Sequence, residues 1–296
     1  MRIGLHALGI GIGARREVID AVAVAAEDAG FSTLWVGEHV VMVDRSASRY
    51  PYAPDGRIAV PADADWLDPM IALSFAAAAT STIRLATGVL LLPEHNPVTL
   101  AKSAASLDRL SHGRLTLGIG IGWSQEEFAA LGVPFRRRGA RTDEYLLAMR
   151  ALWCQDPASF TGDFVNFADI RVNPKPVRDG RIPIIVGGNS DAALGRAART
   201  GDGWYGFNLT DAAHAGERIT LLRALCETAD RDPSEVEIAV ALDHDPGPQE
   251  HRDLVQLGVD ELVLVATPPG DPTSAGQWTR ALRESLHGRW VTGEQS

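Results

Sequence analysis

The sequence predicts an α/β fold, a single closed (β/α)8 TIM barrel with insertion loops, and three observations support it. Short apolar segments alternate with helical patterns along the 296 residues. These segments are apolar throughout, as expected of parallel strands that are buried on both faces. No block of strands without helices interrupts the order, and eight β-α units suit a barrel of about 250 residues or more.

The predicted elements follow one another regularly. The first helix shows the clearest periodicity, because Val18, Ile19, Val22, Ala25 and Ala26 recur at helical spacing before Gly30. The eight predicted strands span residues 2–7, 33–37, 83–90, 115–119, 183–187, 203–206, 236–241 and 261–265. The predicted helices span residues 15–29, 68–80, 97–110, 124–131, 140–153, 190–200, 211–229, 249–257 and 274–286.

Two insertions interrupt this repeat. Residues 41–67 include the run Tyr50-Pro51-Tyr52-Ala53-Pro54, and a long loop of this kind usually forms a lid or a substrate wall. A disordered excursion is the alternative. Residues 160–176 are expected to form a hairpin added outside the barrel. Because no linker separates two folding units, we expect one domain over residues 1–290 and a frayed tail at 291–296.

Composition narrows the functional classes. A net charge of −10 argues against a nucleic-acid partner and suits a protein that binds small molecules. No apolar run approaches the roughly 20 residues that span a membrane, so no membrane partner is expected. The chain enters an apolar strand at once, without signal-peptide features, which favours a cytoplasmic protein. Cys154 and Cys226 are interpreted as two ordinary thiols.

In a barrel, the loops after the strands form the active face, so candidate residues are sought there. His39 follows the second strand and is the leading proton donor, with a structural histidine as the alternative. The glycine-rich runs 118–122 and 187–188 each lead toward a helix, where backbone N–H groups suit a phosphate. Tight strand-to-helix packing is the alternative explanation for such glycines.

Several common sites are not indicated. Neither glycine-rich run has the Lys and Ser/Thr of a nucleotide-triphosphate loop, and a dinucleotide fingerprint is not convincing. No serine nucleophile elbow is present. The histidines at positions 6, 39, 95 and 112 fall in different β-α units, so no metal site is predicted.

Taken together, these motifs identify a family resemblance. The chain resembles the bacterial luciferase-like superfamily of flavin and deazaflavin oxidoreductases, and more narrowly its coenzyme F420-dependent branch. The matching residues are 34–39, 87–93, 96–97, 107–111, 113–114, 118–122, 138–144, 186–188 and 201–204. Each segment is weak evidence alone, and their combination is specific.

The resemblance implies a cofactor site in the barrel mouth. A bulge at the end of the third strand, often with a non-prolyl cis peptide, supports the flat cofactor ring in this family. Backbone amides of the glycine-rich loops would hold the cofactor phosphate. The matching positions are Gly88 and Val89 for the ring, and Gly120, Ile121, Gly122, Gly187, Gly188 and Asn189 for the phosphate.

The resemblance also implies a reaction. The family function would be hydride transfer between deazaflavin C5 and a small organic substrate, with His39 at the reactive edge of the ring. Trp123 stands where sugar-phosphate dehydrogenases of the family have a catalytic glutamate, which argues for a more apolar substrate pocket. Tyr50, from the long insertion, is a second expected pocket residue.

Other interpretations stay open. An FMN-dependent monooxygenase of the same superfamily is the first alternative, with FMN as the cofactor in place of coenzyme F420. A non-catalytic deazaflavin-binding protein is the second. Dimerisation is common in the family, so a homodimer is expected.

Overall fold

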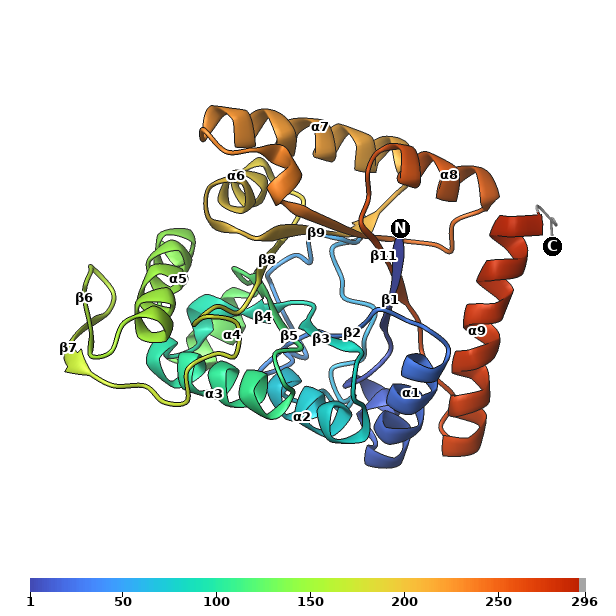
Figure 1. Ribbon diagram of the computed structural model, residues 1–296, viewed down its shortest axis with the longest axis horizontal. Helices are drawn as coiled ribbons and strands as arrows, with labels where there is room; N and C mark the ends of the chain where they lie inside the picture. The colour runs from blue at the N-terminus through green and yellow to red at the C-terminus, as the bar shows by residue number, and fades with distance from the viewer. Residues whose placement is uncertain (293–296) are drawn as a thin grey trace.

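The computed structural model describes residues 1–292 and shows a closed parallel barrel (Figure 1). Each strand pairs in parallel with its neighbours, and pairing of β3 with β5 completes the ring. The predicted (β/α)8 fold is therefore confirmed. The barrel strands are β1 (Arg2–His6), β2 (Thr33–Val36), β3 (Arg84–Thr87), β5 (Leu115–Gly120), β8 (Ile184–Gly187), β9 (Gly203–Leu209), β10 (Glu237–Leu242) and β11 (Glu261–Val265).

The predicted third strand is interrupted. β3 ends at Thr87, and a short strand β4 (Leu90–Leu91) continues the pairing with β5 after a break at Gly88 and Val89. The peptide bond between Gly88 and Val89 is cis. The chain therefore bulges at the position that the family pattern indicated.

Helices surround the strands (Figure 1). Six begin at a side chain that accepts a backbone N–H bond, namely Asp68, Asn96, Ser124, Ser190, Asp211 and Asp271. The helices are α1 (Arg16–Asp28), α2 (Pro69–Ala79), α3 (Pro97–Leu110), α4 (Gln125–Ala130), α5 (Arg138–Cys154), α6 (Asp191–Thr200), α7 (Ala212–Thr228), α8 (Pro248–Gln256) and α9 (Pro272–Thr292). α9 extends beyond its predicted end at residue 286. Of the tail predicted at 291–296, residues 293–296 lie outside the described residues.

Two apolar cores flank the strands. The larger core lies between the strands and the helices and includes the side chains of Leu34, Leu117 and Ile119. The smaller core fills the barrel, where Trp35 stacks on Tyr205 with ring centroids 4.7 Å apart. Because alternate residues of each strand enter opposite cores, the strands are apolar throughout.

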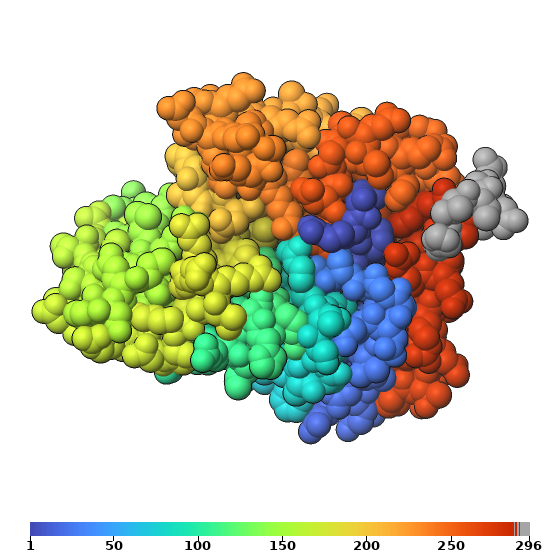
Figure 2. All heavy atoms as spheres, in the orientation of Figure 1, coloured from blue at the N-terminus to red at the C-terminus, as the bar shows by residue number. Residues whose placement is uncertain are grey.

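Both insertions have defined conformations. β6 (Ala158–Thr161) and β7 (Asn166–Ile170) form an antiparallel hairpin outside the barrel, and with α5 it makes the yellow-green lobe in Figure 2. Residues 41–67 cross the barrel mouth without a long helix or strand. Their C-terminal end is fixed by a bond of 3.0 Å from Trp66 Nε1 to the Gly37 carbonyl.

Two further findings concern the chain as a whole. Over residues 1–292, none of the helices is both long and apolar enough to cross a membrane. Cys154 is exposed and Cys226 is buried, and both are free thiols.

Candidate active site

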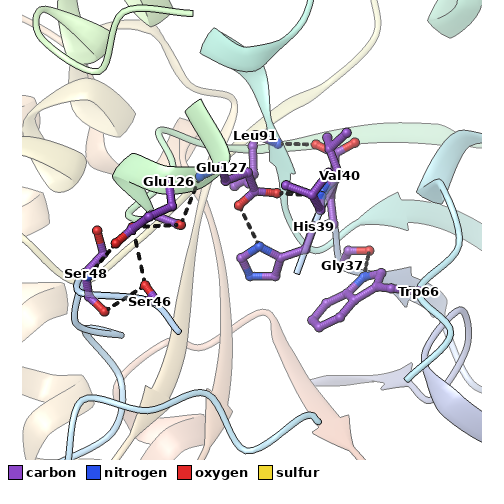
Figure 3. A network of polar contacts seen from close by, with 12 residues as sticks. Gly37, His39, Val40, Ser46, Ser48, Trp66, Leu91, Glu126 and Glu127 are labelled. Atoms are coloured by element: carbon purple, nitrogen blue, oxygen red, sulfur yellow. Dashed lines mark hydrogen bonds and ion pairs between the residues drawn. The ribbon is translucent and has the colours of Figure 1, made fainter. Parts of the chain in front are cut away.

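A buried histidine–glutamate pair lies at the mouth of the barrel (Figure 3). His39 follows β2, and its Nδ1 lies 2.8 Å from Glu127 Oε2 of α4. A carboxylate only accepts hydrogen bonds, so Nδ1 carries the proton of this bond. Within residues 1–292, His39 Nε2 has no protein partner. The side chain of His39 is 8% exposed, so its free nitrogen is largely shielded from solvent.

Backbone hydrogen bonds fix the position of the Glu127 side chain. Its Oε1 accepts bonds from the backbone amides of Val40 at 2.7 Å and Val41 at 3.2 Å. Ser124 caps the helix by accepting the Glu127 amide at 3.2 Å. The carboxylate is 1% exposed, so these bonds replace its lost hydration. Glu127 therefore fixes both the ring and the backbone that carries it.

A second pair of the same kind lies beside the first. His95 Nε2 lies 3.0 Å from both carboxylate oxygens of Glu38, which also accepts the Leu91 amide at 2.6 Å. Burial by itself lowers the pKa of His95, but the hydrogen bond and the charge of Glu38 outweigh it and raise that pKa. The imidazolium form of His95 is therefore more stable than in a free histidine.

Glu94 is a third buried carboxyl group in this region. Both of its oxygens are buried without a hydrogen-bond partner among the described residues. Burial, followed by the charges of Glu127 and Glu38, raises its pKa to about 9. Glu94 is therefore uncharged at neutral pH. It lies under the glycine-rich loop, since a Cβ on Gly122 would approach Glu94 Oε1 to 2.9 Å.

Aromatic side chains line the mouth beside His39. We call the following set the aromatic wall: His39, Trp66, Trp123, Tyr50, Tyr52 and Phe207. Ring centroids lie 4.9 Å apart for His39 and Trp66, 5.7 Å for His39 and Trp123, and 5.4 Å for each of the pairs Trp123–Tyr50, Tyr50–Tyr52 and Tyr52–Phe207. The structure therefore brings the two predicted pocket residues, Trp123 and Tyr50, into contact with each other and close to His39.

The predicted cofactor loops meet around Val89. A Cβ on Gly120 would lie 2.7 Å from Val89 Cγ2, and one on Gly187 would lie 2.6 Å from Val89 Cγ1. These glycines are required because the side chain of the bulge residue occupies the space above them. Gly122 has a φ of +72°, a left-handed conformation that glycine adopts without strain. Ile121 lies between these glycines and is half-buried.

The loop before α6 has both structural and binding potential. The side-chain amide of Asn189 donates to the Phe207 carbonyl at 2.8 Å and accepts from the Phe207 amide at 3.2 Å. Trp204 Nε1 donates to the Gly188 carbonyl at 2.8 Å. These bonds hold the loop in place, and the first N–H groups of α6 lack partners within the helix. An anion would find its donors there.

The predicted residue His39 and the predicted glycines lie at the barrel mouth, and three buried glutamates beside them were not predicted from the sequence. Glu38, Glu94 and Glu127 come from three separate segments, and their partners are up to 88 residues away along the chain. The available signal was the N-terminal position of Glu127 in α4, which by itself indicates only a favourable helix start.

Comparison with known proteins identifies the family. The family model described as luciferase-like monooxygenase matches residues 7–249. Rv0953c of Mycobacterium tuberculosis, an uncharacterized protein, is 39% identical over 267 residues, which cover 90% of this chain and 93% of that protein. An FMNH(2)-dependent dimethylsulfone monooxygenase of Pseudomonas fluorescens is 38% identical over 134 residues, 44% of this chain and 36% of that protein.

A solved structure supports the fold. The coenzyme F420-dependent tetrahydromethanopterin reductase of Methanopyrus kandleri matches with a TM-score of 0.74 at 15% identity, covering 99% of each chain. At this identity the likeness concerns the fold alone. Because the family model spans most of the chain and a mycobacterial relative matches nearly its whole length, this chain belongs to the luciferase-like monooxygenase family.

Proposed function

We propose that the protein is a coenzyme F420-dependent oxidoreductase that transfers a hydride between deazaflavin C5 and a small organic substrate. The observation that carries the proposal is the buried His39–Glu127 pair at 2.8 Å. The preceding residue, Glu38, accepts the amide of Leu91, which follows the bulge at Gly88 and Val89. Reduction of a carbonyl group consumes one proton along with each hydride, and His39 is placed to deliver it.

The residues at the mouth fit a flat cofactor with a phosphate. The bulge residues Gly88 and Val89 are half-buried, and Val89 offers an apolar surface to the back of a ring. Gly188 has a φ of +112° and so presents its backbone without a side chain at the start of α6. Asn189 would hold this loop for the phosphate through its two bonds to Phe207.

In the proposed mechanism the cofactor supplies the hydride chemistry at C5, and the protein supplies the proton and the geometry. Nε2 of His39 donates a proton to the substrate oxygen in reduction and accepts one in oxidation. Glu127 keeps Nδ1 protonated and the ring oriented, because its carboxylate accepts the Nδ1 bond. The aromatic wall limits the access of water to the reacting atoms.

The experiment that tests the proposal is a pair of fluorescence titrations of the purified protein, one with coenzyme F420 and one with FMN. We expect tighter binding of coenzyme F420. Hydride exchange with a panel of ketones and quinones would then identify the reaction. Preferential binding of FMN would contradict the proposal, and tight F420 binding without any exchange would indicate a non-catalytic binding protein.

The second candidate function is an FMN-dependent monooxygenase. It is favoured by the dimethylsulfone monooxygenase relative, whose name specifies FMNH(2). Deazaflavin has carbon in place of the flavin N5 and reacts poorly with oxygen. Oxygen uptake that depends on added FMN and a reductant therefore distinguishes the two functions. For either function we propose a homodimer that acts on small molecules in the cytoplasm.

A further inference from the structure

The 41–67 insertion is fastened to the first turn of α4. Glu126 Oε1 accepts the amides of Ala47 at 2.6 Å and Ser48 at 3.2 Å, and Oε2 accepts the Ser46 hydroxyl at 3.3 Å. The amide of Gln125 returns a bond of 3.0 Å to Ser48 Oγ. Chiefly the hydrogen bond from the Ser48 side chain lowers the pKa of Glu126 to about 2, so the acceptor stays ionised.

The neighbouring residue of the same helix holds the proton donor. Figure 3 shows Glu126 reaching the insertion at Ser46 and Ser48, while Glu127 reaches His39 and Val40. One short helix therefore positions both the candidate catalytic histidine and the segment that covers it. A change at Glu126 can release the insertion while leaving the His39–Glu127 bond in place.

Fastening residues 46–48 determines where two tyrosines lie. Tyr50 is only two residues beyond Ser48, and its ring meets Trp123 at 5.4 Å. Tyr52 is held from the other side, because Asn208 Nδ2 donates to its carbonyl oxygen at 2.8 Å. Its ring then packs between Tyr50 and Phe207. Tyr50 and Tyr52 thus close the aromatic wall only while the insertion stays in place.

The chemistry of the wall defines what it would bind. Five of its six members are Trp, Tyr or Phe, and neither Lys nor Arg is among them. Burial raises the phenol pKa of Tyr50 and Tyr52, so both hydroxyl groups remain neutral donors. Over residues 1–292 neither hydroxyl has a protein partner. Aromatic edges and faces favour a flat ligand, and free hydroxyls favour one with an acceptor oxygen.

We propose that the aromatic wall binds uncharged, planar organic molecules with a carbonyl acceptor, and that Glu126 is the positioning residue that keeps this wall assembled. The proposal rests on the proposed function, because it names the substrate class of the same site. It excludes sugar phosphates and other anions as substrates, since the wall provides no cation to pair with them.

Quinone binding tests the proposal without the cofactor. Menadione is uncharged, planar and carries two carbonyl oxygens, and it quenches tryptophan fluorescence at short range. We expect saturable quenching in the full-length protein. Glu126→Ala should weaken menadione binding by about tenfold, equivalent to ~1.4 kcal/mol. Glu126→Gln keeps a carbonyl acceptor, so its affinity for menadione should fall by less than that of Glu126→Ala.

Glu144→Ala is the matched control. Glu144 accepts the amides of Asp163, Phe164 and Val165 at 2.6–2.8 Å and so fastens the outer hairpin as Glu126 fastens the insertion. This variant should bind menadione like the wild type. Trypsin should cut Glu126→Ala faster than Glu144→Ala after Arg45 or Arg49, which lie in the exposed part of the insertion.

Several outcomes would overturn the proposal. One is wild-type protein that shows no saturable menadione binding, and another is Glu126→Ala protein with unchanged affinity. A third is equal loss of affinity in both alanine variants, which would indicate a general effect on folding. A further outcome is a protein that binds menadione in a Glu126-dependent way and yet binds neither coenzyme F420 nor FMN. That result would support this inference and refute the proposed function.

Discussion

The three buried glutamates at the barrel mouth differ in the hydrogen bonds that they accept. Glu38 bonds one backbone amide and the His95 imidazole, and Glu127 bonds two backbone amides and the His39 imidazole. Glu94 receives no such bond and is kept neutral by burial and by the charges of those two glutamates. The raised pKa of Glu94 therefore reflects an environment in which its carboxyl group is buried without the hydrogen bonds that Glu38 and Glu127 accept.

His39→Ala tests the proton-transfer role. We expect turnover to fall by about 10²-fold or more, the usual contribution of a positioned general acid. Cofactor affinity should change little, because the predicted phosphate loops are separate from His39. The measurements are steady-state rates and the F420 dissociation constant. Unchanged turnover would show that His39 has a structural role only.

Glu94→Gln tests the neutral carboxyl group through stability. The pKa of Glu94 is raised from 4.5 to about 9 in the folded protein, so the folded state binds its proton more tightly than the unfolded state does. Its contribution to stability is complete below about pH 4.5 and is lost as the pH rises toward 9. Gln cannot ionise, so the variant should gain stability relative to wild type as the pH increases.

Thermal unfolding at about pH 5 and about pH 8.5 measures this difference. We expect the melting temperature of Glu94→Gln, relative to wild type, to be higher at the alkaline pH by a few degrees. An equal offset at both pH values would mean that Glu94 is ionised or solvated in the folded protein.

His39 was predictable from sequence because it follows a strand, whereas the pKa of Glu94 depends on charges from two distant segments.

At the scale of elements, close backbone approach closes the barrel. Gly118 of β5 lies against β3, and a Cβ at this position would come 1.9 Å from the Thr87 carbonyl oxygen. The eight strands were predictable because each is a continuous apolar run. The break between β3 and β4 was not predictable from periodicity, since the residues from Leu85 to Leu92 are apolar apart from Thr87 and Gly88. Only the family resemblance indicated a bulge there.

Gly118→Ala should therefore weaken the closure between β3 and β5. The added methyl group meets backbone, which cannot rotate away, and we expect a loss of about 1–3 kcal/mol or more in the free energy of unfolding. Gly247→Ala is the control, because nothing lies within 4 Å of its added Cβ. Denaturant unfolding of both variants measures the effect. Equal stability of the two variants would contradict the close approach.

At the scale of the whole molecule, one helix presents an apolar outer face. α2 contains Ile71 at 58% exposure and Phe75 at 39%, although its opposite face is already buried. Large apolar side chains exposed on one face of a helix often mark a contact between proteins. Within one chain, only one side of α2 is buried. The exposed side could not be recognised from the sequence, because apolar residues occur around the whole helix.

We expect this face to contribute to the proposed homodimer. Light scattering at micromolar concentration should give twice the 31.7 kDa mass of the chain. Ile71→Glu should shift the mass toward that of one chain, because a charge at the contact would be desolvated. Val24→Glu, at a comparably exposed position on α1, serves as the control. A monomeric wild-type protein would refute the expectation.

The first and last strands of the barrel are neighbours in the ring. β1 pairs along its whole length with β11, from Arg2 opposite Glu261 to His6 opposite Val265. During synthesis on the ribosome, more than 250 residues are therefore added after β1 before its second partner strand, β11, is made. Until then the nascent chain carries an unpaired strand edge, which can pair with the edge of another chain.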